Sequence, residues 1–178
     1  MSQWKIREKT VHKTDLFQII EQTITGKNKT KKYEIVERRP TTIVFPLTES
    51  FEIYLLSQYR SLFNKTIIEA VSGHVDNSES PFKSAKRELK EEAGLIANTW
   101  EELLRVDASA SVIRSVMHLF LARDLEETDS SPEEGEEIKI IKMPLSDAIE
   151  KIEKREITSG PTVLGLLYID KLIKEKKL

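Results

Sequence analysis

The spacing of apolar residues changes along the chain, from a strand-like pattern in the first seventy residues to a helix-like pattern after residue 80. Segments rich in β-branched and aromatic residues at first alternate with turn-forming sequences, which is typical of hairpins. We therefore predict two hairpins followed by one short strand: residues 15–25 with 33–39, residues 42–47 with 51–59, and residues 66–71.

A helix is predicted in the middle of the chain, over residues 80–93. Ser80 is a suitable N-cap, Pro81 suits the first turn, and Gly94 suits the position just after the last helical residue. An apolar stripe along this helix is expected to face the core, and three lysines are expected to face solvent. The stripe consists of Phe82, Ala85, Leu89 and Ala93, and the lysines are Lys83, Lys86 and Lys90.

Strand and helix patterns both return after this helix, so the fold class that the sequence predicts is α+β. One stretch, residues 125–137, is acidic and contains Ser130-Ser131-Pro132 and Gly135, and we expect a mobile loop there. The remaining predicted elements are strands at residues 102–106, 116–122 and 137–142, and helices at residues 145–155 and 161–175.

Three glutamates of the predicted central helix point to a metal site. At about 100° per residue, Glu88, Glu91 and Glu92 project as one cluster on one side of the helix. Like charges repel, and an all-oxygen cluster prefers a hard divalent cation such as Mg²⁺ or Mn²⁺. Arg87 precedes Glu91 by four residues and can hold its carboxylate in a charge-assisted pair. The alternative is a solvated acidic helix face, which the flanking sequence disfavours because Glu79 can fold back towards the cluster.

Composition restricts the class of protein further. The chain has 178 residues with 28 Lys and Arg against 30 Asp and Glu, a net charge of −2 at pH 7. This balance argues against a dedicated nucleic-acid-binding protein. The chain has no cysteine, which excludes disulfides and thiolate chemistry, and it has no apolar stretch suited to a signal peptide or a membrane span. We therefore expect a cytoplasmic protein.

The segment from Gly73 to Leu95 carries a resemblance to a known family. Gly73, five further residues, Glu79, seven further residues and then Arg87-Glu88-Leu89-Lys90-Glu91-Glu92-Ala93-Gly94-Leu95 match every fixed position of the Nudix box. The chain thus resembles the Nudix hydrolases, which implies an α/β/α sandwich around a mixed sheet and hydrolysis of a diphosphate linked to a nucleoside. The resemblance also implies a Mg²⁺ site, with Mn²⁺ as a possible substitute, whose ligands are Glu88, Glu92, Glu91, Glu79 and the carbonyl of Ser72.

Shorter motifs outside the box resemble the branch of this family that acts on ADP-ribose and nucleoside-diphosphate sugars. They are Glu37-Arg38-Arg39, Gln58-Tyr59-Arg60, Glu69-Ala70-Val71-Ser72-Gly73, His118-Leu119-Phe120-Leu121-Ala122 and Glu136-Glu137-Ile138. The resemblance implies that Arg39, with Arg38 beside it, lies near the nucleobase. Arg60 would lie near the phosphates, and Glu69 would orient the site. Catalytic roles fall to Glu136 and Glu137, on the loop that supplies the general base, and to Glu91 and Arg87.

Two of these assignments have plain structural alternatives. Arg38 and Arg39 could form an edge-strand charge pair, and the acidic loop could be a disordered tether. One segment also departs from the branch: residues 107–115 contain neither the proline nor the glycine that is usual after the box, and Arg114 adds a charge there. For this reason a nucleoside-diphosphate sugar is at least as good a substrate prediction as ADP-ribose.

The predicted function is Mg²⁺-dependent hydrolysis of ADP-ribose or a nucleoside-diphosphate sugar, giving a nucleoside monophosphate and a sugar phosphate. The alternatives are a Nudix pyrophosphohydrolase acting on nucleoside triphosphates or RNA 5′ ends, and a non-catalytic nucleotide-sensing Nudix domain. Residues 1–40 are predicted to form an N-terminal β arm that dimerises, and residues 41–178 the Nudix hydrolase domain. The expected partners are a nucleoside-diphosphate-linked small molecule and a second copy of the chain, without nucleic acid or membrane.

Overall fold

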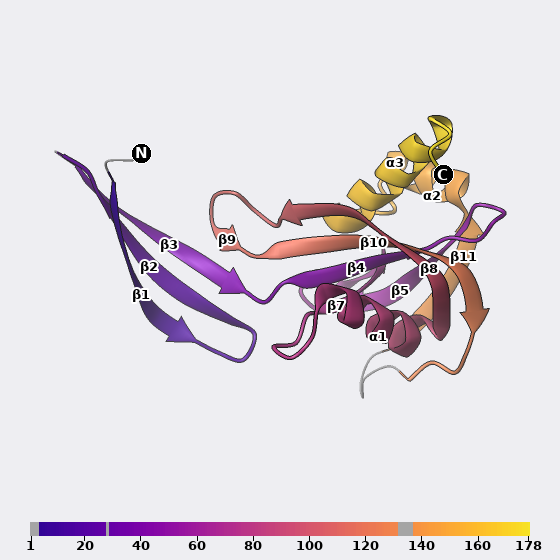
Figure 1. The fold of residues 1–178 in the computed structure, drawn as a ribbon, viewed down its shortest axis with the longest axis horizontal. Coiled ribbons are helices and arrows are strands. Elements are labelled where there is room, and N and C mark those ends of the chain that lie inside the picture. Colours follow the sequence, from indigo (N-terminus) through magenta and orange to yellow (C-terminus); the bar gives the residue numbers. More distant parts are fainter. Residues whose placement is uncertain (1–3, 28, 132–136) are drawn as a thin grey trace. The chain divides into compact units, whose positions relative to one another are not determined.

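The strands that the structure describes form three sheets, divided between two structural units (Figure 1). The computed structural model describes residues 4–27, 29–131 and 137–178. The first unit comprises Met1–Pro40 and Val106–Met117, and the second comprises Thr41–Arg105 and His118–Leu178. The first unit therefore combines the N-terminal part of the chain with a segment from its middle.

The first unit contains strands β1 (Lys5–Lys13), β2 (Phe17–Thr25), β3 (Thr30–Arg38) and β9 (Ile113–Arg114). They form one sheet in the order β1-β2-β3-β9. β2 and β3 pair antiparallel over their whole lengths, which confirms the first predicted hairpin. β1 pairs antiparallel with β2, and β9 adds a short parallel pairing with β3.

Strand β1 is not predicted by the sequence pattern, because its residues KIREKTVHK are rich in charge and are all exposed. It runs antiparallel to β2 from Lys5 opposite Thr25 to Lys13 opposite Gln18, with a bulge between Thr10 and His12. β1 is therefore a strand because it pairs with β2. Its residues are exposed, so they lack the alternation of buried apolar and exposed polar residues by which a strand is usually predicted.

The remaining elements lie wholly or mostly in the second unit: β4 (Thr41–Pro46), β5 (Glu52–Arg60), β6 (Lys65–Glu69), β7 (Val71–His74), α1 (Pro81–Ala93), β8 (Leu95–Asp107), β10 (Val116–Glu127), β11 (Ile138–Pro144), α2 (Leu145–Glu153) and α3 (Gly160–Lys174). One sheet has the order β7-β4-β10-β8, and the other has the order β11-β5-β6. Helix α1 packs against β7 and β4, whereas α2 and α3 pack against each other and against β11, β5 and β4. In Figure 1, α1 lies below the strands of this unit and α2 and α3 lie above them, so the sheets are covered by helices on both sides.

Two strand predictions in this unit are wrong. Residues 42–47 and 51–59 do not form a hairpin, because β4 and β5 belong to different sheets. The bridge between Leu47 and Ile53 is an isolated one, outside the named strand pairs. The predicted strand at residues 66–71 is divided into the end of β6 and the start of β7, which also belong to different sheets. Pro46 ends β4 at the first change of sheet, whereas no Gly or Pro marks the second, between Glu69 and Val71.

Several element ends also differ from the prediction. β8 begins at Leu95, directly after the central helix, and β10 continues to Glu127, so the first residues of the predicted acidic loop are strand. The two predicted C-terminal helices are confirmed, with ends that differ by no more than two residues. None of the helices in the described ranges is long and apolar enough to cross a membrane.

The core of the second unit is built on the apolar stripe of α1. Ala85, Leu89 and Ala93 are buried and pack in one cluster with residues of β4, β7, β8 and β10. Phe82 is an exception to the predicted stripe, because it is 39% exposed. Its ring meets the Trp100 ring edge-on, with 5.5 Å between the centroids, so Phe82 packs at the margin of the core instead of inside it.

Candidate active site

Helix α1 begins and ends where the sequence predicts. Ser80 Oγ accepts a hydrogen bond from the Lys83 backbone N–H at 3.3 Å, and Pro81 occupies the first turn. Gly94 has a φ of 59°, a left-handed conformation that favours glycine, and its N–H donates to the Lys90 carbonyl at 3.0 Å. These caps fix the register of the helix and therefore the directions of its carboxylates.

Glu88 and Glu92 lie on the buried side of α1, where β7 passes close to the helix. They are 9% and 7% exposed. A Cβ atom at Gly73 would lie 1.8 Å from Glu88 Oε1, so a glycine is required to leave room for this carboxylate. Glu92 Oε2 accepts a hydrogen bond from the Ser72 backbone N–H at 3.0 Å. The backbone of β7 thus contacts the two carboxylates that helical spacing brings to one face.

Arg87 contacts the other predicted carboxylates as well as Glu88. Its Nε lies 3.1 Å from Glu79 Oε1, and its Nη1 lies 2.9 Å from Glu91 Oε2. The same Nη1 lies 2.8 Å from Glu88 Oε1. The predicted pair of Arg87 and Glu91 is confirmed, and Glu79 folds back towards the helix as expected. Arg87 Nη2 also donates to the His74 carbonyl at 3.3 Å, which links the guanidinium to the end of β7.

These contacts stabilise the charged form of Arg87. Hydrogen bonding to Glu79 is the main cause that raises the pKa of Arg87 above its ordinary value, and Glu91 and Glu88 act in the same direction. Partial burial opposes the shift. Arg87 is therefore a permanent cation within the cluster, and it offsets part of the repulsion among the glutamates.

The donor set of this cluster fits a hard divalent cation. Its glutamates and the adjacent backbone carbonyl offer oxygen atoms, which Mg²⁺ and Mn²⁺ prefer. Across residues 4–27, 29–131 and 137–178, no three His, Cys, Asp or Glu side chains meet in an arrangement that would hold a metal ion. Arg87 and the N–H of Ser72 hold the carboxylates instead. The metal-ligand roles of Ser72, Glu79, Glu88, Glu91 and Glu92 stay predictions.

Two predicted substrate-binding residues meet on the other sheet of the second unit. Arg60 lies at the end of β5, and its Nε and Nη2 are each 2.6 Å from Oε1 of Glu69 at the end of β6. The N–H of Ala70 donates to the buried Thr162 Oγ1 at 2.9 Å, so α3 fixes the chain where β6 leads into β7. The structure thus pairs Arg60 with Glu69, and their contacts with a substrate stay predictions.

The remaining predicted site residues lie outside this cluster. Arg38 and Arg39 belong to the first unit. Glu137 is exposed and immediately precedes β11, and Glu136 lies outside the described residues. The roles assigned to these four residues stay predictions.

Two hydroxyl groups that support the second unit near the box are not among the residues predicted from the sequence. Ser84 Oγ donates to the His74 carbonyl at 3.2 Å and accepts from Arg87 Nη2 at 3.4 Å. It could have been found, because it is a small polar residue three positions before Arg87, on the same side of the helix. Thr162, which holds Ala70, gave no comparable signal, because 92 residues separate the two.

A comparison with protein-family models decides which family this arrangement represents. The model described as the NUDIX domain matches residues 37–163. The chain belongs to the Nudix family. The carboxylate cluster of α1 with its glycine on β7 is therefore the Nudix box, as the sequence resemblance implied.

Curated relatives show which proteins this Nudix chain is similar to. It is 27% identical over 172 residues to the ADP-ribose pyrophosphatase of Bacillus subtilis (strain 168), and this alignment covers 92% of this chain and 93% of that protein. It is 28% identical over 148 residues to the GDP-mannose pyrophosphatase of Escherichia coli O9:H4 (strain HS), and this alignment covers 78% of this chain and 77% of that protein.

A solved structure shares the fold of this Nudix chain. The crystal structure of an ADP compounds hydrolase aligns with a TM-score of 0.84 and 23% sequence identity, covering 99% of this chain and 97% of that one. At this level of identity the likeness concerns the fold alone. It confirms the predicted α+β, Nudix-type fold.

Proposed function

We propose that this Nudix protein hydrolyses the diphosphate bond of ADP-ribose or of a nucleoside-diphosphate sugar, releasing a nucleoside monophosphate and a sugar phosphate. The observation that carries the proposal is the carboxylate cluster, in which the buried Glu88 and Glu92 contact the strand that bears Gly73. Similarity to an ADP-ribose pyrophosphatase and to a GDP-mannose pyrophosphatase over most of the chain supports this class of substrate.

The cofactor that we propose is Mg²⁺, with Mn²⁺ as a substitute. Its ligands would be Glu88, Glu92, Glu91, Glu79 and the carbonyl of Ser72. When bound, such a cation neutralises the charge of a diphosphate and lowers the pKa of a water molecule. The need for it follows from charge, because carboxylates gathered on one helix face repel a diphosphate.

The chain's own residues keep the carboxylates in fixed directions. Arg87 holds Glu79 and Glu91, and the N–H of Ser72 holds Glu92. Side chains that are already restrained lose less freedom when substrate binds, which lowers the cost of assembling the site. In this proposal Arg87 acts on catalysis through the glutamates that it positions.

A glutamate is proposed as the general base. Water attacks one phosphorus atom and gives its proton to the base, while the bridging P–O bond breaks and its electron pair stays with the leaving phosphate. The candidates are Glu136, Glu137 and Glu91. Glu91 is the candidate held within the box, since its carboxylate contacts Arg87 and its carbonyl accepts from the Ser131 N–H at 2.9 Å.

Substrate binding is assigned to Arg60 and Glu69 in the second unit and to Arg38 and Arg39 in the first. The contact with Glu69 directs the Arg60 guanidinium and leaves the side chain 37% exposed. A guanidinium that is oriented in this way, with further N–H groups available, suits an oxygen atom of a diphosphate.

The test is a hydrolysis screen with Mg²⁺ over ADP-ribose, GDP-mannose, a nucleoside triphosphate and a dinucleoside polyphosphate. We expect nucleoside monophosphate to be released from ADP-ribose or GDP-mannose, and release to stop when EDTA removes the cation. Turnover of the triphosphate alone would support the pyrophosphohydrolase alternative. Tight nucleotide binding without turnover would support a sensing domain.

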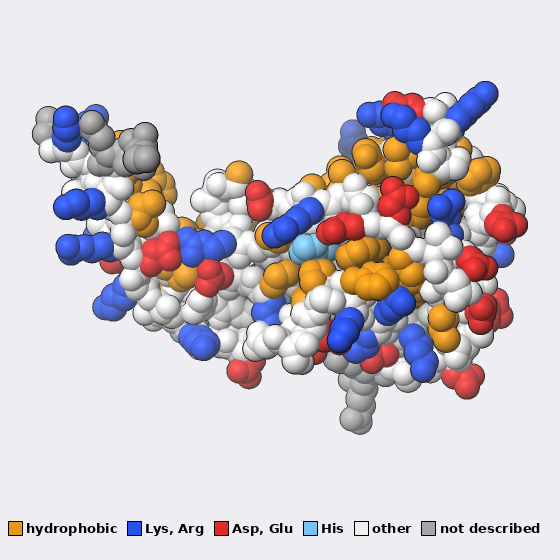
Figure 2. All heavy atoms as spheres, viewed as in Figure 1, with side chains coloured by type: hydrophobic (Ala, Val, Ile, Leu, Met, Phe, Trp, Pro, Cys, Tyr) orange, Lys and Arg blue, Asp and Glu red, His pale blue; other side chains and the backbone are white. Residues whose placement is uncertain are grey.

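We further propose that the protein is a cytoplasmic homodimer. The sheet of the first unit leaves apolar side chains in water, with Ile6 57% and Tyr33 42% exposed, and exposed apolar side chains of this kind suit an interface with another chain. Residues 1–40 contain ten Lys and Arg against five Asp and Glu, and Figure 2 shows several of these cations along the strands of this unit. Residues 41–178 contain 18 against 25, so opposite charges favour association of two copies. Sedimentation at micromolar concentration should give the mass of two chains, and a single-chain mass would contradict the dimer.

The proposed cytoplasmic location rests on composition, because a chain without cysteine suits the reducing cytoplasm.

A further inference from the structure

The chain of the second unit passes from one sheet to the other at Ala70. Glu69, the last residue of β6, pairs with Leu56, and Val71, the first residue of β7, pairs with Val44. Because β6 and β7 belong to different sheets, Ala70 lies in neither ladder. Ala70 is also buried, and a buried backbone N–H needs an acceptor. The acceptor for this N–H must therefore come from outside the two ladders.

Thr162 of α3 supplies this acceptor. Its Oγ1 accepts from the Ala70 N–H at 2.9 Å, and both residues are buried, so water has little access to the contact. The helix itself packs closely at this place, because a Cβ atom at Gly165 would lie 2.0 Å from Phe45 Cζ. Phe45 belongs to β4, the strand that pairs with β7. Helix α3 therefore contacts both the start of β7 and the strand beside it.

Ser72 follows Ala70 by two residues and belongs to the carboxylate cluster. Its N–H donates to Glu92 Oε2 at 3.0 Å, and its carbonyl is one of the ligands proposed above for Mg²⁺. β7 has only four residues, so its position depends strongly on how its ends are held. Helix α1 lies on one side of the strands of this unit and α3 on the other (Figure 1). Thr162 therefore acts on the cluster through the backbone between Ala70 and Ser72.

We propose that Thr162 is a positioning residue for the metal site: by accepting from the Ala70 N–H, it sets the position of Ser72, which in turn holds Glu92. The inference rests on the function and the cofactor proposed above. Without the hydroxyl group, the Ala70 N–H would be buried without an acceptor, and the chain would shift until water or another group reached it. Metal sites tolerate such shifts poorly, since loss of a group that orients the ligands weakens metal affinity about 10–100-fold.

A positioning role for Thr162 predicts a different outcome from a merely structural role. A contact that only stabilises the fold changes the midpoint of unfolding, and the metal affinity of the folded protein stays the same. A contact that positions Ser72 changes both quantities. Metal affinity, measured on folded protein and without turnover, therefore separates the two roles.

The test is titration of the full-length protein with MnCl₂ alone, followed by the electron paramagnetic resonance signal of free Mn²⁺. Glu92→Gln defines the site, because binding that this variant loses belongs to the proposed cluster. Thr162→Val replaces the hydroxyl group by a methyl group of similar size and should weaken binding at this site about tenfold. Thr162→Ser keeps the hydroxyl group, and its affinity should stay within about twofold of the unchanged protein.

Thr48→Val is the matched control in the same unit. Thr48 Oγ1 also accepts from a backbone N–H, that of Glu52, at 3.0 Å. The replacement therefore removes a contact of the same kind, in the turn between β4 and β5, which carries no proposed ligand. The Mn²⁺ affinity of Thr48→Val should equal that of the unchanged protein.

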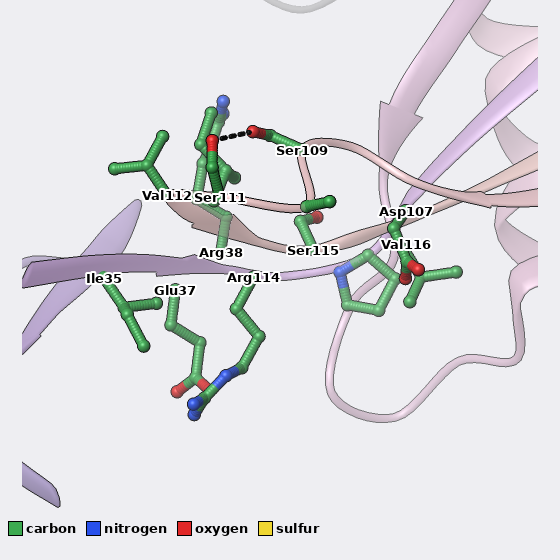
Figure 3. Close-up of a pocket in the computed structure, with 13 residues that line it drawn as sticks. Ile35, Glu37, Arg38, Asp107, Ser109, Ser111, Val112, Arg114, Ser115 and Val116 are labelled. Atoms are coloured by element: carbon green, nitrogen blue, oxygen red, sulfur yellow. Dashed lines mark hydrogen bonds and ion pairs between the residues drawn. The ribbon is translucent and has the colours of Figure 1, made fainter. Parts of the chain in front are cut away.

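A second control removes a long-range contact from the first unit. Arg114 and Glu37 line a cavity of about 560 Å³ there (Figure 3). Arg114 Nη1 donates to Glu37 Oε1 at 3.1 Å, and its Nη2 donates to Oε1 of Glu8, 106 residues away, at 2.6 Å. All the proposed metal ligands belong to the second unit. Arg114→Leu should therefore leave the Mn²⁺ affinity unchanged.

Hydrogen exchange tests the same coupling without any substitution. If the Thr162 contact favours metal binding, then the metal must protect the Ala70 amide hydrogen, because coupling between two sites is reciprocal. We expect Mg²⁺ to slow exchange at Ala70 about tenfold, and to slow it less than about twofold at the Glu52 amide, which Thr48 holds. This measurement keeps the inference testable if Thr162→Val does not fold.

The inference is overturned if Thr162→Val, shown by thermal unfolding to be folded, binds Mn²⁺ as tightly as the unchanged protein. It is also overturned if Mg²⁺ protects the Ala70 amide no more than the Glu52 amide. Failure of the proposed function is a different result, namely absence of nucleotide-sugar hydrolysis with Mg²⁺. Metal binding that depends on Thr162 without such hydrolysis would support the inference and contradict the function.

Discussion

Arg87 and Arg114 each gather carboxylates, but from very different distances along the chain. The partners of Arg87 lie within eight residues of it, and its side chain is 29% exposed. Those of Arg114 lie 77 and 106 residues away, and its side chain is 43% exposed. The first cluster depends on residues of one helix and of the turn just before it, whereas the second requires the four strands β1, β2, β3 and β9 to be paired before the charges meet.

The stability of the two clusters depends on different physical effects. Around Arg87, burial of Glu88 and Glu92 makes an unpaired charge expensive, so the cluster is held strongly. Around Arg114, water surrounds the partners, and each exposed ion pair contributes little by itself. We therefore expect mutation to damage the first cluster far more than the second, and added salt to act mainly on the second.

Replacement of Arg87 by Ala should have the largest effect on stability. Glu88 would keep its burial and lose its cation, and Glu79 and Glu91 would lose the contact that orients them, which together should cost about 2–4 kcal/mol of unfolding free energy. Urea unfolding measures this loss. Lys83→Ala on the same helix is the control, because Lys83 is exposed and its change should stay within about 0.5 kcal/mol. Equal losses in the two variants would show that Arg87 does not organise the cluster.

Gly73→Ala should have the next largest effect. Its Cβ would lie 1.8 Å from Glu88 Oε1, so the carboxylate must move or β7 must shift, at a cost of about 1–3 kcal/mol. Hydrolysis should fall with it, because Glu88 is a proposed ligand. Gly160→Ala is the matched control, since a Cβ there meets nothing within 4 Å. Hydrolysis by Gly73→Ala at the rate of the Gly160→Ala control would contradict this account of the close approach.

Added salt should change the effect of the Arg114 substitution on the unfolding midpoint more than that of the Arg87 substitution. As NaCl rises to about 1 M, where the Debye length is about 3 Å, the difference in unfolding midpoint between the unchanged protein and Arg114→Leu should shrink. The corresponding difference for Arg87→Ala should persist, because two of its three partners, Glu79 and Glu88, are less exposed than the partners of Arg114. A parallel decrease for both variants would remove the distinction between the clusters.

The smallest expected effect is the pH dependence of Glu8. Its pKa is lowered from 4.5 to about 2, so its contribution to stability is fully present above pH 4.5 and is lost as the pH falls through about 2. The difference in unfolding midpoint between the unchanged protein and Glu8→Gln should be constant from neutral pH to 4.5 and shrink below it. A difference that disappears already at pH 5 to 6 would mean that Arg114 does not hold this carboxylate.

The same contrast explains what could be predicted from the sequence. Ser80 and Gly94 act within one helix, so the ends of this helix can be predicted. The contact between Arg87 and Glu91, four residues apart on the same helix, can be predicted for the same reason. The family of the chain was also predicted, since the box is contiguous from residue 73 to residue 95.

The features that the sequence did not predict depend on partners far away in the chain. β1 is defined by its pairing with β2, and the predicted hairpin of β4 and β5 is wrong because these strands join different sheets. The Thr162 contact with Ala70 likewise has no local signal. Phe82 has the same helical spacing as the core residues Ala85 and Leu89, but it lies beside Trp100 at the margin of the core. Helical spacing alone does not distinguish a position inside the core from one at its margin.

The proposed function requires the carboxylates of α1 to take part in diphosphate hydrolysis. The most direct measurement is the rate at which Glu92→Gln releases AMP from ADP-ribose with Mg²⁺, beside the unchanged protein and the exposed Glu101→Gln control. Gln keeps the size of Glu and can still accept from the Ser72 N–H, so folding should be preserved. We predict a rate lowered about 100-fold or more for Glu92→Gln and an unchanged rate for Glu101→Gln. A rate for Glu92→Gln within about twofold of the unchanged protein would contradict the claim.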